Sequence, residues 1–82
     1  MYRFISEAPL YAMGNQMSVK NSMRAGCYNC LTIFDSKEVK EYCDGNTCIC
    51  PRCGSDTVIP SSARRLTIGL LRAIHEYWLK DS

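Results

Sequence analysis

The chain has 82 residues, six of them cysteine, and a formal net charge of +2 at neutral pH. A chain of this length forms one domain with a small apolar core, so we expect an additional stabilising element. Its N-terminus lacks an apolar run of the signal-peptide type, and no segment approaches the ~18 apolar residues needed to cross a bilayer. We therefore expect a soluble, cytoplasmic protein whose cysteines stay reduced.

Composition divides this single domain into three sections. Residues 1–26 form an arm, residues 27–59 form a ribbon bracketed by two CxxC pairs, and residues 60–82 form a linker and a C-terminal helix. In the arm, Asn15 can cap the N-terminus of a short helix, and Gly26 can end that helix in a left-handed conformation. The predicted helix carries Met17, Lys20, Met23 and Arg24.

The middle of the ribbon is predicted to form an antiparallel hairpin. Asp44-Gly45-Asn46 is a strong turn signal between residues 39–43 and residues 47–50. Before the hairpin, Asp35 and Glu38 have the spacing of a capping box, which predicts a single helical turn directly after Asp35.

The last section contains the clearest helix of the chain. Thr67 offers an N-cap hydroxyl, Leu66 and Leu71 can form a hydrophobic staple around it, and the helix is predicted to reach about Lys80. We expect the ribbon and the methionines of the arm to cover its apolar face. That face consists of Leu70, Leu71, Ile74, Tyr77 and Trp78.

The two CxxC pairs, Cys27 with Cys30 and Cys50 with Cys53, have the spacing of a four-cysteine zinc site. A tight turn between paired cysteines lets both sulfurs face one ion, and each pair then forms a zinc knuckle. Four thiolates fill a tetrahedral shell and leave no position for an activated water. We therefore expect one structural zinc ion and no enzymatic activity.

The residues inside the pairs suit such turns. In the second pair Pro51 presets φ and Gly54 supplies a left-handed residue. In the first pair Tyr28 and Asn29 occupy the turn, and Asn29 tolerates the left-handed region. Four thiolates and one divalent ion would bring the formal charge from +2 to about zero, so bulk basicity does not indicate nucleic-acid binding.

Two cysteines remain beside the proposed hairpin turn. Cys43 and Cys48 can be ordinary small apolar residues, a pair that oxidises as a labile switch, or, for Cys48, an alternative ligand to Cys50. We favour the first interpretation. For His75, the only histidine, we favour a structural or surface role over metal binding or proton transfer.

These elements predict a small α+β zinc ribbon in which two zinc knuckles and a β-hairpin pack against a C-terminal helix, with a short N-terminal helical arm. The string CYNCLTIFDSKEVKEYCDGNTCICPRCGSDTVIP, followed by LTIGLLRAIHEYW, resembles a family of small bacterial and phage zinc-ribbon proteins of unknown function. The resemblance covers about residues 15–79 and implies that the four paired cysteines are ligands. Cys43 and Asn46 depart from the tryptophan and glycine usual in that family.

Three functional hypotheses follow. The preferred one is a non-enzymatic interaction module that docks on a protein partner, such as a phage- or bacterium-encoded modulator of a host protein. Aromatic residues and arginine dominate interface energetics. The candidate contact residues are therefore Tyr28, Arg52, Arg64, Arg65, Tyr77 and Trp78.

The alternatives belong to other classes. Arginines such as Arg52, Arg64, Arg65 and Arg72 could contact phosphates in a nucleic-acid-binding zinc ribbon. The CPxCG segment also resembles the iron site of rubredoxin, which leaves a rubredoxin-like iron or thiol redox protein open. The identity of the metal separates this last hypothesis from the others.

Overall fold

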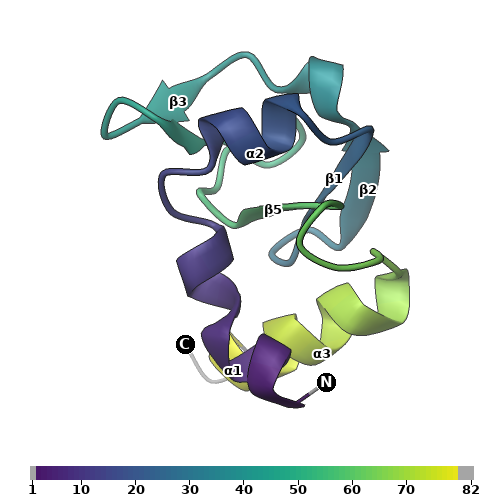
Figure 1. Cartoon of the computed structure of the whole chain (residues 1–82). Helices are drawn as coiled ribbons and strands as arrows, with labels where there is room; N and C mark the ends of the chain where they lie inside the picture. Colours follow the sequence, from purple (N-terminus) through teal and green to yellow (C-terminus); the bar gives the residue numbers. More distant parts are fainter. Residues whose placement is uncertain (1, 80–82) are drawn as a thin grey trace.

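A computed structural model describes residues 2–79, and in it three helices surround a small antiparallel sheet (Figure 1). The chain therefore has a small α+β fold, which is compatible with a zinc ribbon. The helices are α1 (Tyr2–Tyr11), α2 (Gln16–Lys20) and α3 (Ile68–Trp78), with a 3-10 turn, η1 (Ser36–Glu38).

The three-stranded sheet has the order β2-β1-β5, and a separate two-stranded hairpin is formed by β3 and β4. All strand pairs are antiparallel. The strands are β1 (Arg24–Cys27), β2 (Thr32–Asp35), β3 (Tyr42–Cys43), β4 (Thr47–Cys48) and β5 (Val58–Pro60).

Each face of the three-stranded sheet is covered by a different layer. The register pairs Gly26 with both Ile33 and Ile59, so these three side-chain positions share one face, which α1 and α3 cover. The neighbouring positions, such as Ala25 and Phe34, share the opposite face, which α2 and the hairpin cover. Figure 1 shows α1 and α3 on one side of the sheet and α2 with β3 on the other.

The two layers enclose two small apolar cores. The first, between the sheet and the long helices, contains Phe4, Ala8, Ala12, Tyr28, Ile59, Leu70, Leu71 and Ile74. The second, under α2 and the hairpin, contains Val19, Ala25, Cys27, Phe34, Val39, Cys48, Cys50 and Val58.

The helix predicted for the arm is shorter than expected. It spans only Gln16–Lys20, and the strand β1 begins at Arg24, so Met23 and Arg24 lie outside the helix. Gly26 is a buried strand residue rather than a left-handed helix end. Asn15 precedes the helix, but its side chain makes no cap hydrogen bond.

The helix α1 was not predicted, and it contains Pro9 in its interior. Proline has no amide hydrogen, so the carbonyl of Ile5, four residues earlier, loses its helical donor. The indole Nε1 of Trp78 donates to that carbonyl at 2.8 Å. A side chain of α3 thus replaces the missing hydrogen bond of α1.

The other local predictions are largely confirmed. Thr67 caps α3 through a bond from the Leu70 amide to its hydroxyl, and the capping box of Asp35 and Glu38 is present. The predicted hairpin turn is present, with Asp44 at φ 51 and Gly45 at φ 87. The hairpin strands have only two residues each.

The cover of α3 differs in part from the prediction. Leu71 and Ile74 are buried, but Met17 and Met23 are 66% and 85% exposed and do not cover them. The helix α1, together with residues of the sheet, takes that place. The described helix ends at Trp78, and the predicted end near Lys80 lies outside the described residues.

Candidate metal centre

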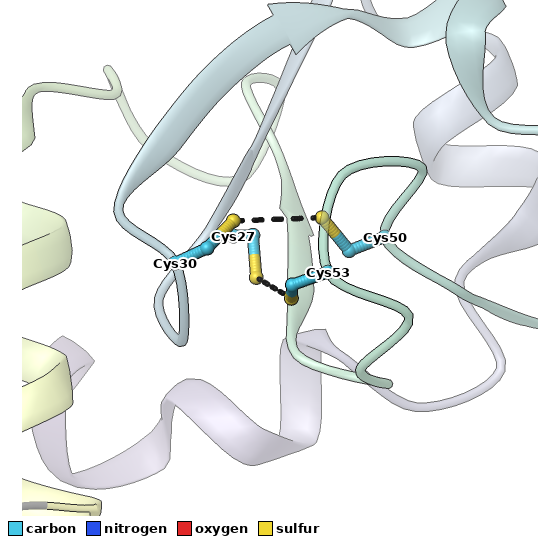
Figure 2. A group of neighbouring side chains, drawn as sticks. All are labelled: Cys27, Cys30, Cys50 and Cys53. Atoms are coloured by element: carbon cyan, nitrogen blue, oxygen red, sulfur yellow. Dashed lines mark hydrogen bonds between the residues drawn. The ribbon is translucent and has the colours of Figure 1, made fainter.

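The two CxxC pairs form two turns that face each other (Figure 2). The first turn joins β1 to β2, and in it the Leu31 amide donates to the Cys27 carbonyl at 2.9 Å. The second turn precedes β5, and in it the Gly54 amide donates to the Cys50 carbonyl at 3.0 Å. The two turns therefore share one hydrogen-bonding pattern.

The residue after each pair adopts the left-handed conformation that this pattern requires. In the second turn this residue is Gly54, at φ 77, as predicted. In the first turn it is Leu31, at φ 58, and not Asn29. Leucine rarely adopts this conformation, but the Leu31 side chain packs against the first core, which offsets part of the strain.

The four sulfurs lie together at distances suited to one metal ion. Cys27 Sγ lies 3.6 Å from Cys53 Sγ, and Cys30 Sγ lies 3.7 Å from Cys50 Sγ (Figure 2). All four sulfurs lie within 4.8 Å of one another. A tetrahedral ion with bonds of about 2.3 Å to sulfur needs ligand atoms about 3.8 Å apart. The cysteines are free rather than disulfide-bonded, and they could hold a metal ion.

Backbone amides point at the first sulfur of each pair. The Asn29 amide donates to Cys27 Sγ, and the Arg52 amide donates to Cys50 Sγ, both at 3.3 Å. These donors favour the thiolate over the thiol, because they stabilise negative charge on sulfur. The tight turn therefore supplies electrostatic support as well as spacing.

Two side chains add to this support, and the sequence analysis missed both. Thr57 is buried, and its Oγ1 lies 3.0 Å from Cys27 Sγ. Asn29 Nδ2 donates to Cys53 Sγ at 3.5 Å. The position of Asn29 inside a CxxC pair could have indicated this role, whereas Thr57 is brought to the sulfurs only by the pairing of β5 with β1.

The four thiols differ in their acidity. Burial raises the pKa of Cys27 and of Cys50 above the ordinary thiol value. Burial also raises the pKa of Cys53, but hydrogen bonds from the Asn29 side chain and the Ser55 amide outweigh it and bring the pKa to about 7. Cys53 is exposed, so the cluster reaches solvent on its side.

The remaining cysteines lie outside this cluster. The register pairs Cys43 with Thr47 and Tyr42 with Cys48, so Cys43 and Cys48 project from opposite faces of the hairpin. That arrangement disfavours a disulfide between them. Cys48 is fully buried in the second core, and burial raises the pKa of its thiol to about 11. These positions favour the interpretation of Cys48 as a small apolar core residue.

His75 connects α3 to the first CxxC turn. Its Nδ1 lies 3.0 Å from the carbonyl oxygen of Tyr28. A carbonyl oxygen only accepts, so Nδ1 carries the proton. His75 is not among the described residues that cluster as metal ligands.

The aromatic residues proposed as partner contacts differ in how exposed they are. The prediction that Tyr28 belongs to an exposed contact surface is wrong, because its side chain is only 4% exposed and is part of the first core. Tyr77 and Trp78 are 47% and 44% exposed. The Tyr77 hydroxyl lies 3.3 Å from that of Tyr2, and the two rings pack edge to face.

The three arginines are all exposed. Arg52 donates from Nε and Nη2 to the carboxylate of Glu38, at 3.1 Å and 2.9 Å. Arg64 stacks over the ring of Phe4, with the guanidinium carbon 5.6 Å from the ring centroid. Arg65 lines a groove beside the start of α3. The structure thus does not bring these arginines together into one contact surface.

Comparisons with protein-family models, with curated proteins and with solved structures return no match for this chain. Among the described residues, no helix is both long and apolar enough to span a membrane.

Proposed function

We propose that this chain is a non-enzymatic interaction module built around one structural zinc ion. The observation that carries the proposal is the convergence of four sulfurs from two matched turns to within 4.8 Å of one another. Zinc prefers such a set of four thiolates, and classical zinc modules depend on it for folding. Cys27, Cys30, Cys50 and Cys53 are the proposed ligands.

The position of the cluster supports a structural role. One turn joins β1 to β2 and the other leads into β5, so an ion would join segments that are distant in the sequence. Two of the sulfur-bearing residues, Cys27 and Cys50, also belong to the second apolar core. Binding the ion would therefore also stabilise the packing of that core.

The closed ligand set supports a role without catalysis at the metal. Four thiolates occupy every position of a tetrahedral ion, so neither water nor substrate could bind there. What remains for function is the surface of the module. We place the chain with small bacterial or phage zinc-ribbon proteins, on the strength of the cysteine pattern and the C-terminal segment. Its proposed role is to dock on a host protein.

The first test is the metal content of the purified protein. We expect one zinc per chain and a colourless sample, and we expect Cys27→Ser to lose the ion. Cys43→Ser is the matched control, because Cys43 lies outside the cluster and should leave the metal content unchanged. A coloured iron protein would instead support an electron-transfer role.

The second test is removal of the metal. Zinc contributes about 10 to 16 kcal/mol to the folding of small zinc peptides, which is comparable to the whole stability of a domain. We expect a strong chelator to unfold the chain, as measured by circular dichroism, and added zinc to refold it. A chain that keeps its full structure after complete chelation would overturn the proposal.

A further inference from the structure

The two edges of the three-stranded sheet differ in whether their outward-facing backbone amides and carbonyls already have hydrogen-bond partners. At the β5 edge, the Val58 carbonyl accepts a bond from Asn15 Nδ2 at 2.7 Å. Pro60 has no amide hydrogen, and its carbonyl accepts from the Ala63 amide at 3.2 Å. The helices α1 and α2 also pack against β5. This edge offers little to an added strand.

The β2 edge is different. At the start of β1 the Arg24 carbonyl accepts from the Ser61 amide at 3.0 Å, and just after β1 the Tyr28 amide donates to the Thr57 carbonyl at 3.1 Å. Both bonds are on the β5 side of β1. In an antiparallel sheet the direction of these bonds alternates, so Ala25 bonds with Phe34 of β2. The next residue of β2, Ile33, must then direct its amide and carbonyl away from β1.

Ile33 therefore offers one donor and one acceptor at the edge. Within residues 2–79, neither of its backbone groups has a partner outside the strand ladder. Two residues on, the amide of Asp35 is occupied by Glu38 Oε2 at 3.4 Å, and its carbonyl accepts the first bond of η1, so Ile33 provides the free groups of this edge. Figure 1 shows β2 at the outside of the molecule. Unpaired edge groups of this kind are a template for strand addition.

A groove adjoins this edge on the face covered by the long helices. The side chains of Leu71 and Leu66 cover the sheet at Gly26, and the neighbouring position Ile33 is only partly buried. The groove there has a volume of about 410 Å³. It is lined by Met23, Arg24, Ile33, Ser61, Arg65 and Leu66.

The groove combines apolar walls with positive charge. Met23 is 85% exposed, and Ile33 and Leu66 are partly buried. Arg24 and Arg65 are exposed, and neither has an ion-pair partner in the part of the chain that the structure describes. A segment that fits this groove therefore needs an apolar side chain and carboxylates.

We propose that the β2 edge and this groove bind an extended acidic segment of a partner protein, which adds as an antiparallel strand beside Ile33. This inference rests on the proposed role of the chain as an interaction module and names the partner's chemistry. Alternate residues of an added strand point to the same face. The residue paired with Ile33 places an apolar side chain in the groove. An acidic residue two positions away lies on the same face as the groove that Arg24 and Arg65 line. It stands opposite Asp35, whose carboxylate accepts from the Lys37 amide at 2.8 Å.

The test uses the zinc-loaded full chain and a fluorescein-labelled peptide, Thr-Glu-Thr-Val-Thr-Glu-Thr, with binding followed by fluorescence anisotropy. We expect saturable binding and a downfield shift of the Ile33 amide in NMR spectra. Arg65→Glu should weaken binding by about tenfold, because it replaces attraction by repulsion. The matched control is Arg72→Glu, which makes the same charge change on α3 away from the groove and should have no effect.

Two altered peptides separate strand addition from simple charge attraction. N-methylation of the valine removes the donor for the Ile33 carbonyl while keeping every charge, and it should weaken binding by about tenfold. Replacing both glutamates by lysine should abolish binding. Equal binding of the methylated peptide, or no effect of Arg65→Glu, would overturn the proposal.

Metal content is measured on the same samples, so the two proposals fail separately. A chain with one zinc that does not bind the peptide would overturn strand addition and leave the structural metal centre standing. Peptide binding by a folded chain without zinc would overturn the structural metal centre and leave strand addition standing. A labelled oligonucleotide that binds through Arg65, when the peptide does not, would assign the groove to nucleic acid and also overturn strand addition.

Discussion

Gly26 lies where side chains at the start of α3 pack tightly on the sheet. A Cβ atom on this residue would lie 3.1 Å from Leu71 Cδ1 and 3.3 Å from Leu66 Cδ1, closer than side chains normally approach. Glycine inside a strand often marks such a close approach. The residue is therefore required for the distance between helix and sheet, and not for a left-handed turn.

Substitution of this glycine should destabilise the protein. We expect Gly26→Ala to lower the free energy of unfolding of the zinc-loaded protein by about 1–3 kcal/mol, because the added methyl group overpacks the core. Chemical denaturation measures the change. Gly69→Ala is the matched control. Gly69 lies in α3, and a Cβ atom there would make only an ordinary contact, with Thr67 Oγ1 at 3.8 Å. Alanine at this position should therefore raise the free energy of unfolding by up to about 1 kcal/mol. Equal effects at both sites would refute the packing explanation.

At the scale of the element, α1 is completed by a residue of α3. Pro9 removes the hydrogen bond that the Ile5 carbonyl would receive within the helix, and Trp78 donates to that carbonyl instead. This bond is at an exposed position, so water would replace the indole in part, and its net contribution is that of a typical intramolecular hydrogen bond. The indole therefore fixes the packing of the two helices as well as contributing apolar surface.

This relation predicts a measurable coupling. Trp78→Phe removes the indole donor and should destabilise the native chain, whereas in a Pro9→Ala background the restored helical bond should reduce that cost. We expect a coupling free energy of about 0.5–1.5 kcal/mol from the double-mutant cycle. Strictly additive effects of the two substitutions would show that the indole bond and the missing helical bond are unrelated.

The two CxxC turns predict how metal affinity depends on pH. Burial raises the pKa of Cys27 and of Cys50, so these thiols hold protons that the ion must displace, and affinity falls as pH falls. Although burial opposes it, the pKa of Cys53 is lowered to about 7. Below that pH a proton competes with the ion for Cys53 in the folded protein, so the decline should become steeper there.

Competition with a chelating dye between pH 6 and pH 8 would measure this dependence. The Asn29 side chain contributes the largest hydrogen-bonding effect on Cys53, so Asn29→Ala should raise its pKa and move the steeper region to higher pH. The expected direction is weaker zinc binding at neutral pH in this variant. A zinc affinity that does not change with pH would contradict the role of these thiols as ligands.

At the scale of the whole molecule, Asn15 joins elements that lie far apart in the sequence. It is 4% exposed, and its Nδ2 donates to the carbonyls of Tyr11 and Val58, at 3.0 Å and 2.7 Å. Its Oδ1 accepts from the Cys48 amide at 3.0 Å. One buried amide thus ties the end of α1 to β5 and to the hairpin.

Substitutions of Asn15 can separate this role from helix capping. Asn15→Ala should cost about 2–4 kcal/mol, because it leaves buried backbone groups unpaired. Aspartate is an excellent N-cap, but it lacks the amide donors and would bury a charge, so Asn15→Asp should be at least as damaging. Thermal unfolding of the zinc-loaded protein measures the loss of stability in both variants.

The control for this pair is Asn46→Ala. Asn46 is exposed, and within residues 2–79 its side chain has no hydrogen bond. Its replacement should change stability by less than about 0.5 kcal/mol. If Asn15→Asp proved as stable as the native chain, the residue would act as a helix cap after all.

The parts of the fold that depend on neighbouring residues were predictable. The cap at Thr67, the capping box at Asp35 and the turn at Gly45 all follow from short-range hydrogen bonding or backbone preference, and each is present. The strands β1 and β2 were not predicted. Each has only four residues, and they become strands by pairing across the first CxxC turn.

The spacing and chemistry of the four paired cysteines were determined by the sequence alone, because a CxxC turn needs only adjacent residues to present its sulfurs. The support of those sulfurs by Thr57, the bridging role of Asn15 and the close approach at Gly26 were decided by the tertiary structure. These relations join residues that the chain separates widely. Only the pairing of β1 with β2 and β5, and the packing of two layers on that sheet, bring them into contact.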